Sequence, residues 1–593
     1  MTNTKKNQQL IRDNLQDRSG ADNINNEFDA LLVSQYRFDI IHHLPLEIVT
    51  MIVLTIDTMT ERFKLLDVSR TWRNKISKCS SVWSKIRIRH TNGFPYKDTI
   101  SPRQISLLPL VKQHIVELEI MDTNSTPLHT IYRQIAQQIH FEKLQKLSIL
   151  GSSLTNDAEL LYNALSTMAM LKHLKLDQYP TMEHLQETID IGMIITQCPI
   201  LETFSFGRAG ESSIAINEFQ HHNNLISFEL VSTRDITADE MKHILEGCTR
   251  LRRLVLRRVD DMAIDLLARL GTNLEYVGIG TSLDNGEIYD EDPSNNQYEG
   301  TRSSLTHRDD PQSSTLTATK VGGCGVRDVS LCIYYLNSAT HYTSFFDKHS
   351  SSIRTLDLTI LSDFDYESDP VNQNLEARWK SLVNVSQFTN LRALSVRCDS
   401  AICRTLIAPI IQSAPNLRWL RFYEEELTGQ ETITAIANLD HLQKLGINVS
   451  YAFEDELEDL FRTLSRKQVS TLEEVSFGSP LVSTKSYNID DVLPFLADIP
   501  TLKHITFTEL SDRSISKNSL VELFKNLYSC TNICSVTLIG LDCVDGDVLR
   551  HLAMIQSVEH VYLELLSKIT PTDIQIIFEN TQIQVSVREI HEF

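Results

Sequence analysis

Arginine, tryptophan and tyrosine recur at alternating positions in a few short apolar segments of this chain. These side chains offer no strong nucleophile, but they are the types enriched at the energetic centres of protein interfaces. Paired guanidinium N–H donors also match a carboxylate or a phosphate, so an acidic or phosphorylated segment is a natural ligand. For any single residue the alternative is an ordinary solvated arginine or a partly packed ring. The candidate partner-binding residues are Arg253, Arg257, Tyr276, Arg397, Trp419, Arg421 and Tyr423.

Signatures of catalysis are missing from the sequence. It contains no G-x-S-x-G, no phosphate-binding P-loop and no H-E-x-x-H. The glycine-rich stretch 322–325 neither follows a strand pattern nor opens a helix, and the ten cysteines include no C-x-x-C pair. The pairs His42-His43 and His221-His222 lack ligand partners at useful spacing. We therefore expect a non-catalytic protein with no metal site and no cofactor.

A short pattern, apolar-x-x-apolar-x-apolar, recurs down most of the chain. It contains or adjoins the candidate partner-binding residues and so determines where they lie. Sixteen copies occur, and a partial seventeenth begins at Ile583. The copies begin at Ile115, Leu144, Leu171, Leu201, Leu225, Leu251, Leu274, Val326, Ile353, Leu391, Leu417, Leu442, Leu472, Leu502, Ile533 and Val558. Their alternation is typical of a strand that is exposed on one face, whereas a strand buried on both faces reads as a continuous apolar run.

The spacing of the copies indicates a solenoid. Most intervals lie at or near the period of about 20–29 residues that is typical of leucine-rich repeats. We expect short parallel strands inside, helices outside and one continuous core, because no unit can bury its apolar face alone. The residues that flank the last two apolar positions then point to the concave face. Sixteen strands at ~4.8 Å give an arc of roughly 75 Å, which suits a protein partner. The alternative is an ordinary α/β sheet.

Two intervals break the period. Residues 281–325 are rich in Asp, Asn, Ser, Thr and Gly, so we expect a disordered loop there. Residues 361–386 include an acidic insert that we expect at the surface. The Ser and Thr clusters of the first segment could accept phosphate, although an unregulated spacer is the simpler interpretation. The repeats otherwise resemble the cysteine-containing and ribonuclease-inhibitor-like subclasses, but the usual Asn or Cys after the last apolar position is mostly missing.

Composition and charge exclude several classes of protein. The chain has 593 residues, more than one hydrophobic core holds, and no apolar run approaches the ~20 residues that span a bilayer. The N-terminus lacks the apolar core of a secretory signal, so we expect a cytoplasmic or nuclear location and no membrane partner. The net charge is −21, which disfavours nucleic acid as a partner because phosphates require a basic surface.

The segment 41–90 has a pattern of its own. Pro45 suits the first turn of a helix, and Ile48, Ile52 and Val53 recur on one helical face. Two further helical patterns follow, one through Phe63 and Val68 and one through Trp72 and Val82. Three helices of this size leave much apolar surface exposed, so we expect the module to complete itself against a partner.

This segment resembles an F-box, the motif by which substrate receptors of Skp-cullin-F-box (SCF) ubiquitin ligases dock on a small adaptor. The matching residues are Leu44-Pro45, Glu47-Ile48, Ile52, Val68-Ser69-Arg70, Trp72-Arg73 and Val82-Trp83. The stretch from Thr55 to Lys64 departs from the family, which usually has a short Leu-Asp-Pro-type turn there. The resemblance implies adaptor contacts by Leu44, Pro45, Ile48, Ile52, Val68 and Trp72. For Ile52, Val68 and Trp72 the alternative is that they mainly hold the helices together.

The two patterns together predict the organisation of the chain. We expect a disordered tail (1–40), an F-box (41–90), a connector (91–112) and a leucine-rich-repeat solenoid (113–593). The resemblance implies the substrate-recognition subunit of an SCF ubiquitin ligase. Its partners would be a Skp-type adaptor, through it a cullin-RING ligase, and a protein substrate on the concave face that is ubiquitinated and degraded. The alternative is a non-degradative leucine-rich-repeat scaffold or inhibitor.

Overall fold

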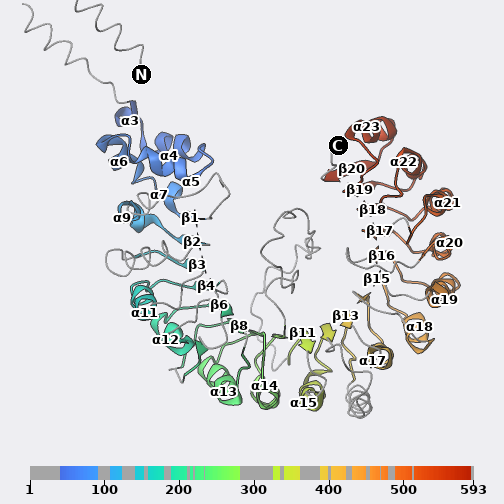
Figure 1. Ribbon diagram of the computed structural model, residues 1–593, viewed down its shortest axis with the longest axis horizontal. Coiled ribbons are helices and arrows are strands. Elements are labelled where there is room, and N and C mark those ends of the chain that lie inside the picture. Colours follow the sequence, from blue (N-terminus) through green and yellow to red (C-terminus); the bar gives the residue numbers. More distant parts are fainter. Residues whose placement is uncertain are drawn as a thin grey trace, which may run out of the picture.

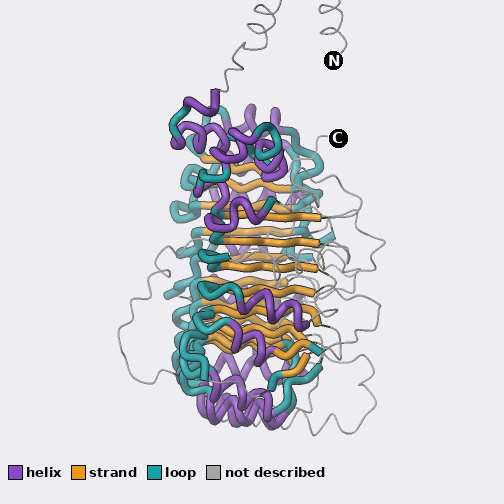
Figure 2. Tube along the Cα trace, turned by 90° about the vertical axis from the view of Figure 1, so that its left-hand side faces the viewer, coloured by secondary structure: helices purple, strands orange, loops and turns teal. Residues whose placement is uncertain are grey.

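Eighteen parallel strands form one continuous curved sheet on the inner side of the described chain, and helices cover its outer side (Figure 1). The computed structural model describes residues 40–90, 107–122, 141–151, 158–178, 188–209, 214–217, 221–232, 234–280, 325–333, 339–360, 387–398, 402–422, 430–448, 454–467, 469–478, 488–510 and 513–588. Viewed from the side, the strands stack as rungs along the arc (Figure 2). This arrangement is a repeat solenoid.

Each strand pairs with the strand of the next repeat. The strands of the large sheet, in their order of pairing, are β1 (Lys85–His90), β2 (Glu117–Asp122), β3 (Lys146–Gly151), β4 (His173–Gln178), β6 (Thr203–Ala209), β8 (Ser227–Ser232), β9 (Arg253–Leu256), β10 (Tyr276–Ile279), β11 (Asp328–Ile333), β12 (Thr355–Ile360), β13 (Ala393–Cys398), β14 (Trp419–Phe422), β15 (Lys444–Asn448), β16 (Glu474–Gly478), β17 (His504–Thr508), β18 (Ser535–Ile539), β19 (His560–Glu564) and β20 (Gln584–Arg588). A second, two-stranded sheet pairs β5 (Ile189–Asp190) with β7 (Ile214–Ala215).

The helices fall into two groups. Those on the outer side of the arc are α9 (Leu108–Val111), the 3-10 helix η1 (Lys112–His114), α11 (Ala158–Ser166), α12 (Ile191–Gln197), α13 (Ala238–Gly247), α14 (Asp261–Leu270), α15 (Ala339–His349), α17 (Ile402–Gln412), α18 (Gln430–Ala437), α19 (Glu454–Ser465), α20 (Leu493–Ala497), α21 (Lys517–Leu527), α22 (Gly546–Ala553) and α23 (Pro571–Phe578). Those at the N-terminal end are α3 (Ile40–His43), α4 (Leu46–Leu54), α5 (Met59–Leu65), α6 (Arg70–Ile76) and α7 (Ser80–Trp83).

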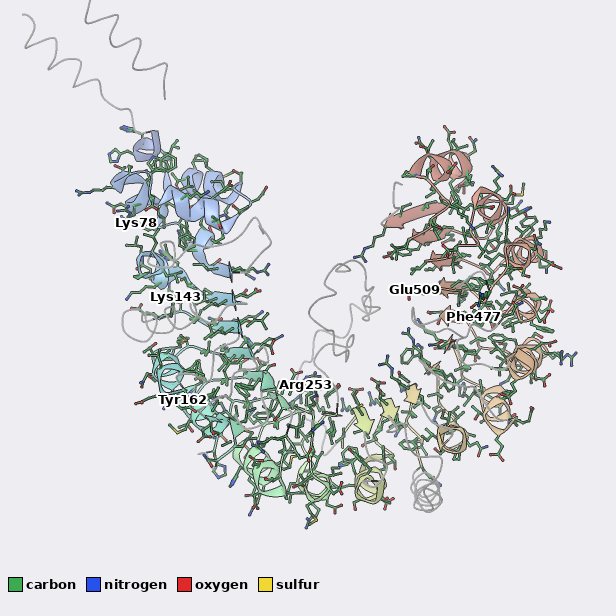
Figure 3. All side chains as sticks on the ribbon, in the orientation of Figure 1. Lys78, Lys143, Tyr162, Arg253, Phe477 and Glu509 are labelled. Atoms are coloured by element: carbon green, nitrogen blue, oxygen red, sulfur yellow. The ribbon has the colours of Figure 1, made fainter. Side chains whose placement is uncertain are left out.

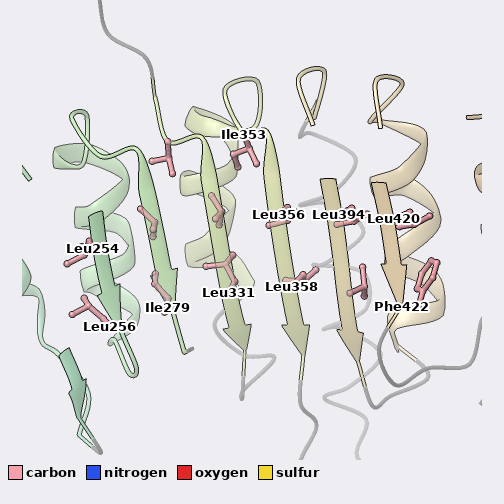
Figure 4. Close-up of a cluster of buried hydrophobic side chains, with 14 of the residues drawn as sticks. Leu254, Leu256, Ile279, Leu331, Ile353, Leu356, Leu358, Leu394, Leu420 and Phe422 are labelled. Atoms are coloured by element: carbon pink, nitrogen blue, oxygen red, sulfur yellow. The ribbon is translucent and has the colours of Figure 1, made fainter. Parts of the chain in front are cut away.

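The three apolar positions of each copy build the core. In β12, Leu356 and Leu358 point inward and pair in register with the corresponding residues of β11 and β13. Ile353, which precedes β12, is buried beside them (Figure 4). The same buried set repeats in every unit from β2 to β19, so the apolar side chains form one core along the arc, while Val587 of the last strand is 45% exposed.

Asparagine side chains close the turns between helix and strand. In several repeats the residue before the first apolar position is asparagine, and its amide donates to a carbonyl in the turn of the preceding repeat. The Nδ2 atoms of Asn390 and Asn416 lie 2.6 and 2.7 Å from the carbonyl oxygens of Ser351 and Thr389. The asparagine that is usual in such repeats follows the last apolar position, whereas these asparagines stand ahead of the first one.

The sheet extends further toward the N-terminus than the predicted boundary at residue 113. β1 pairs with β2 over its full length and lies within the segment 41–90. Its sequence signal was present, because Trp83-Ser84-Lys85-Ile86-Arg87-Ile88 is another copy of the repeat pattern with tryptophan in the first position. All sixteen predicted copies and the partial seventeenth form strands β2 to β20 of the large sheet, and β1 adds one more.

The helical module also differs in detail from the predicted three helices. Val68 lies in the turn between α5 and α6, and Val82 lies in the separate short helix α7. The predicted tail (apart from Ile40), the loop 281–325 (apart from Gly325), the insert 361–386 and Tyr423 lie outside the described residues.

Candidate functional site

Helix α4 presents apolar side chains on two sides. Val49 and Val53 face inward and are fully buried. Ile48 and Ile52, one helical turn apart, keep 41% and 48% of their surface exposed. Burial of large apolar side chains is the main stabilising term in folding. An exposed apolar stripe on a helix therefore indicates a surface that a partner protein covers.

The rest of the predicted adaptor-contact residues divide between surface and core. Val68 is 58% exposed in its turn, and Pro45 is exposed immediately before α4. Leu44 and Trp72 are half-buried and pack against the core. The structure thus leaves Pro45, Ile48, Ile52 and Val68 available for contact, whereas Leu44 and Trp72 also hold the module together.

The interior of this module is tightly held. Trp83 is fully buried, its indole Nε1 donates to the Ile76 carbonyl at 2.8 Å, and its ring lies 5.1 Å from that of Phe63. The Lys75 ammonium donates to the carbonyls of His42 and Leu44, which ties α3 and the start of α4 to α6. The exposed apolar side chains are therefore carried by helices whose interior is well packed.

On the concave face, Arg253 and Tyr276 form a pair. They are register partners on β9 and β10, and the Arg253 guanidinium carbon lies 4.1 Å from the centre of the Tyr276 ring. Burial raises the pKa of the Tyr276 hydroxyl, and the Arg253 charge opposes that rise. Figure 3 shows Arg253 on the inner side of the arc. The two predicted contact residues thus act as one stacked unit, with Arg257 half-buried just beyond the end of β9.

A second cluster lies on β12 to β14. Arg421 is the register partner of Ser395, and Ser395 is the register partner of Asp357. The Ser330 hydroxyl on β11 donates to the Asp357 carboxylate at 3.3 Å. Burial raises the pKa of Asp357, and the neighbouring Ser395 and Ser330 hydroxyls and the charges of Arg397 and Arg421 oppose that rise. The two arginines therefore lie around a carboxylate.

Asp357 was missed in the sequence analysis. It occupies the concave position between the last two apolar residues of its copy, so the alternation alone could have found it. Gly446 on β15 leaves room for the Arg421 side chain, because a Cβ at this position would lie 3.0 Å from Arg421 Cγ. The stem of Arg421 thus lies over a position that has no side chain.

The predicted contact residues do not form one cluster. The pair on β9 and β10 is separated from β13 and β14 by β11 and β12, so at ~4.8 Å per strand the two groups lie roughly 14 Å apart. Trp419 is half-buried beside Ala393, its register partner. An extended segment of a partner protein spans such a distance more readily than a small molecule does.

Two further findings concern other kinds of site. Within the described ranges, no group of three or more His, Cys, Asp or Glu side chains is placed to hold a metal ion. None of the helices in the part of the chain that the structure describes is long and apolar enough to cross a membrane.

Comparison with known proteins leaves the family open. No protein-family model and no curated protein matches the sequence. Among solved structures, the complex of Rad7 and Elc1 from yeast is 14% identical, with 88% of this chain and 95% of that chain covered and a TM-score of 0.31. The leucine-rich-repeat-containing protein LegL7 from Legionella pneumophila is 16% identical, with coverage of 45% and 86% and a TM-score of 0.30. A Bacteroides fragilis protein is 12% identical, with coverage of 45% and 75% and a TM-score of 0.31. At such TM-scores these likenesses carry no argument about function.

Proposed function

We propose that this protein is the substrate-recognition subunit of an SCF-type ubiquitin ligase, with an F-box at residues 41–90 docking on a Skp-type adaptor. The observation that carries the proposal is the exposed apolar face of the N-terminal module. Ile48, Ile52 and Val68, which the sequence resemblance assigns to adaptor contact, are exposed beside a well-packed interior. Side chains that served only to hold the helices together would be buried.

The solenoid supplies the second half of this function. Its concave face presents Arg253 and Tyr276 on β9 and β10 and, beyond β11 and β12, Arg397, Trp419 and Arg421 on β13 and β14, and we assign to it the binding of a protein substrate. In this proposal the protein makes and breaks no bonds and needs no cofactor. It raises the effective concentration of the substrate near the ubiquitin-conjugating enzyme and orients its lysines. A cytoplasmic or nuclear location accords with such a role.

Co-purification tests the docking half. The full chain, affinity-tagged, should retain a Skp-type adaptor and a cullin, and Leu44→Ala/Pro45→Ala should lose both. Ubiquitination of captured proteins in the reconstituted complex should be lost in the same variant. If the wild-type chain retains neither protein, or the variant retains both equally, the receptor function is refuted.

The second candidate is a scaffold or inhibitor that uses the same solenoid without ubiquitin transfer. The long concave surface supports it as well as it supports a receptor. Capture with a variant lacking residues 41–84 would enrich substrates that otherwise turn over if the protein is a receptor. Under the scaffold function, the deletion leaves the abundance of captured partners in cells unchanged.

A further inference from the structure

Four arginines occupy the same repeat position in four consecutive repeats. Arg327, Arg354, Arg392 and Arg418 each stand directly before the first residue of a strand, from β11 to β14. Their main chains are hydrogen-bonded in series, with the amides of Arg354, Arg392 and Arg418 donating to the carbonyl of the preceding arginine at 2.6, 2.8 and 2.8 Å. We call this set the arginine ladder. It follows the edge of the sheet at which the strands begin, outside the concave clusters described above.

At three other places along this edge, the same position carries charges of opposite sign in neighbouring repeats, while several further repeats have an uncharged residue there. Lys172 Nζ lies 2.7 Å from Glu202 Oε1, and Arg252 Nη1 lies 3.1 Å from Glu275 Oε1. Lys503 Nζ lies 2.8 Å from Glu473 Oε1. Three ion pairs between adjacent repeats thus neutralise charged residues at this edge, and the arginine ladder differs from them in having like charges in adjacent repeats.

Three of the four arginines, Arg354, Arg392 and Arg418, have no carboxylate next to them in sequence, whereas Arg327 is followed by Asp328 and its amide donates to the carbonyl of Glu275. Arg354, Arg392 and Arg418 are exposed, and no ion pair joins them to an acidic side chain among the described residues. The four residues before each of these arginines and the one after it are uncharged. Three like charges at strand spacing repel one another, and no carboxylate among the described residues is paired with them. Such an arrangement favours an anionic ligand over the empty state.

We propose that the arginine ladder binds an acidic linear segment of a partner protein that runs across the ends of β11 to β14. Three steps of ~4.8 Å give about 14 Å, which an extended segment of about five residues spans. Each guanidinium can hold a carboxylate through two N–H donors. Trp419 follows Arg418 directly and is half-buried, so it offers an apolar surface at one end of the ladder.

Charge complementarity selects a peptide over nucleic acid. The whole chain carries a net charge of −21, so a long polyphosphate would be repelled wherever it left the ladder, whereas a short acidic segment would not extend that far. The proposal rests on the proposed function only in taking the partner to be the protein destined for ubiquitination. Binding is measured without ligase components, so the two can fail separately.

The test uses the full chain and fluorescein-labelled hexaglutamate as the probe, in a polarisation titration at low salt. Hexaglutamate should bind, and Arg354→Gln/Arg392→Gln/Arg418→Gln should weaken binding at least tenfold and reduce its salt dependence. The matched control is Lys172→Gln/Arg252→Gln/Lys503→Gln, which removes the same charge from the same edge. It should change affinity less than threefold. The ladder variant should also melt no lower than wild type, because it relieves repulsion.

Several outcomes would overturn the proposal. Equal weakening by the control variant would mean that the probe senses only overall charge. Equal binding of hexaglutamine would remove the role of carboxylates, and tighter binding of an oligothymidylate than of hexaglutamate would assign the ladder to nucleic acid. Binding of hexaglutamate only to variants lacking residues 281–324 or 361–386 would show that the chain's own acidic segment is the occupant.

Discussion

Truncation of Ile48 and Ile52 to alanine should weaken adaptor binding while leaving the fold intact. Each substitution removes three carbon groups, worth about 0.8 kcal/mol apiece when fully transferred from water. Because 41% and 48% of these side chains are exposed in the free chain, only that share remains to be buried on docking. The pair therefore accounts for about 2 kcal/mol, and the Kd should rise about 30-fold.

The matched control for this experiment is Leu54→Ala. Leu54 is on the same helix and is 43% exposed, but at 100° per residue it projects 120° or more away from both isoleucines. Its truncation removes a similar exposed apolar area from the same helix, yet the Kd should stay within about twofold of the wild-type value.

Isothermal titration calorimetry with a purified Skp-type adaptor measures these affinities, and thermal melting checks that the variants fold. A Kd that moves less than threefold in Ile48→Ala/Ile52→Ala would refute the assignment of this face. A comparable loss in Leu54→Ala would show that the whole helix, rather than one stripe of it, determines binding. A large drop in melting temperature for the double variant would contradict the exposure of its side chains.

Three further predictions concern stability. Trp83→Ala should cost about 3–5 kcal/mol locally, since it removes a fully buried ring, and hydrogen exchange should speed up in β1 and the helices before it. Burial by itself raises the pKa of Glu240, but hydrogen bonds from Arg234 and Thr237 and the Arg234 charge hold it below its usual value. The stability that Glu240 provides is therefore complete above its unfolded pKa of about 4.3 and is lost as the pH falls through the lowered pKa, and Arg234→Met should shift protection of α13 amides against acid to higher pH. Burial lowers the pKa of His349 to about 4, and neither of its ring nitrogens has a hydrogen-bond partner among the described residues. Stability should fall as the pH drops from about 6.5 to about 4, where only the unfolded chain takes up the proton, and His349→Leu should abolish this slope in acid titrations of the melting temperature.

The strands of the solenoid were readable from sequence because each copy buries its apolar residues at fixed offsets. Of the large sheet, only β1 was not predicted, since Trp83 stands where the other copies have leucine, isoleucine or valine and the segment was assigned to the helical module. The apolar pattern likewise marked Ile48 and Ile52, but whether they face the core or solvent depends on how α4 packs against α6 and α7. That packing joins residues far apart in the chain, so local periodicity does not contain it.

The concave contacts were harder to predict for the same reason. Alternation places Arg253 and Tyr276 on one face, but their stacking depends on the register between β9 and β10. Alternation places Asp357 on the concave face, but its surroundings depend on the alignment of four repeats, because Ser330 and Arg421 lie on β11 and β14 on either side of it. The arginine ladder, too, is a property of aligned repeats: no single copy of the pattern distinguishes Arg354 from any other exposed arginine.

The pairing of β1 with β2 joins the helical module to the sheet without an intervening hinge in the described chain. Trp83, at the end of α7, anchors the first rung directly to the helices. The number of repeats between β1 and β14 then sets the distance and the orientation of a ligand on the arginine ladder relative to a partner on α4. Deleting one whole repeat would shorten the distance between the two binding surfaces by about 4.8 Å and rotate one relative to the other, while both surfaces stay chemically unchanged.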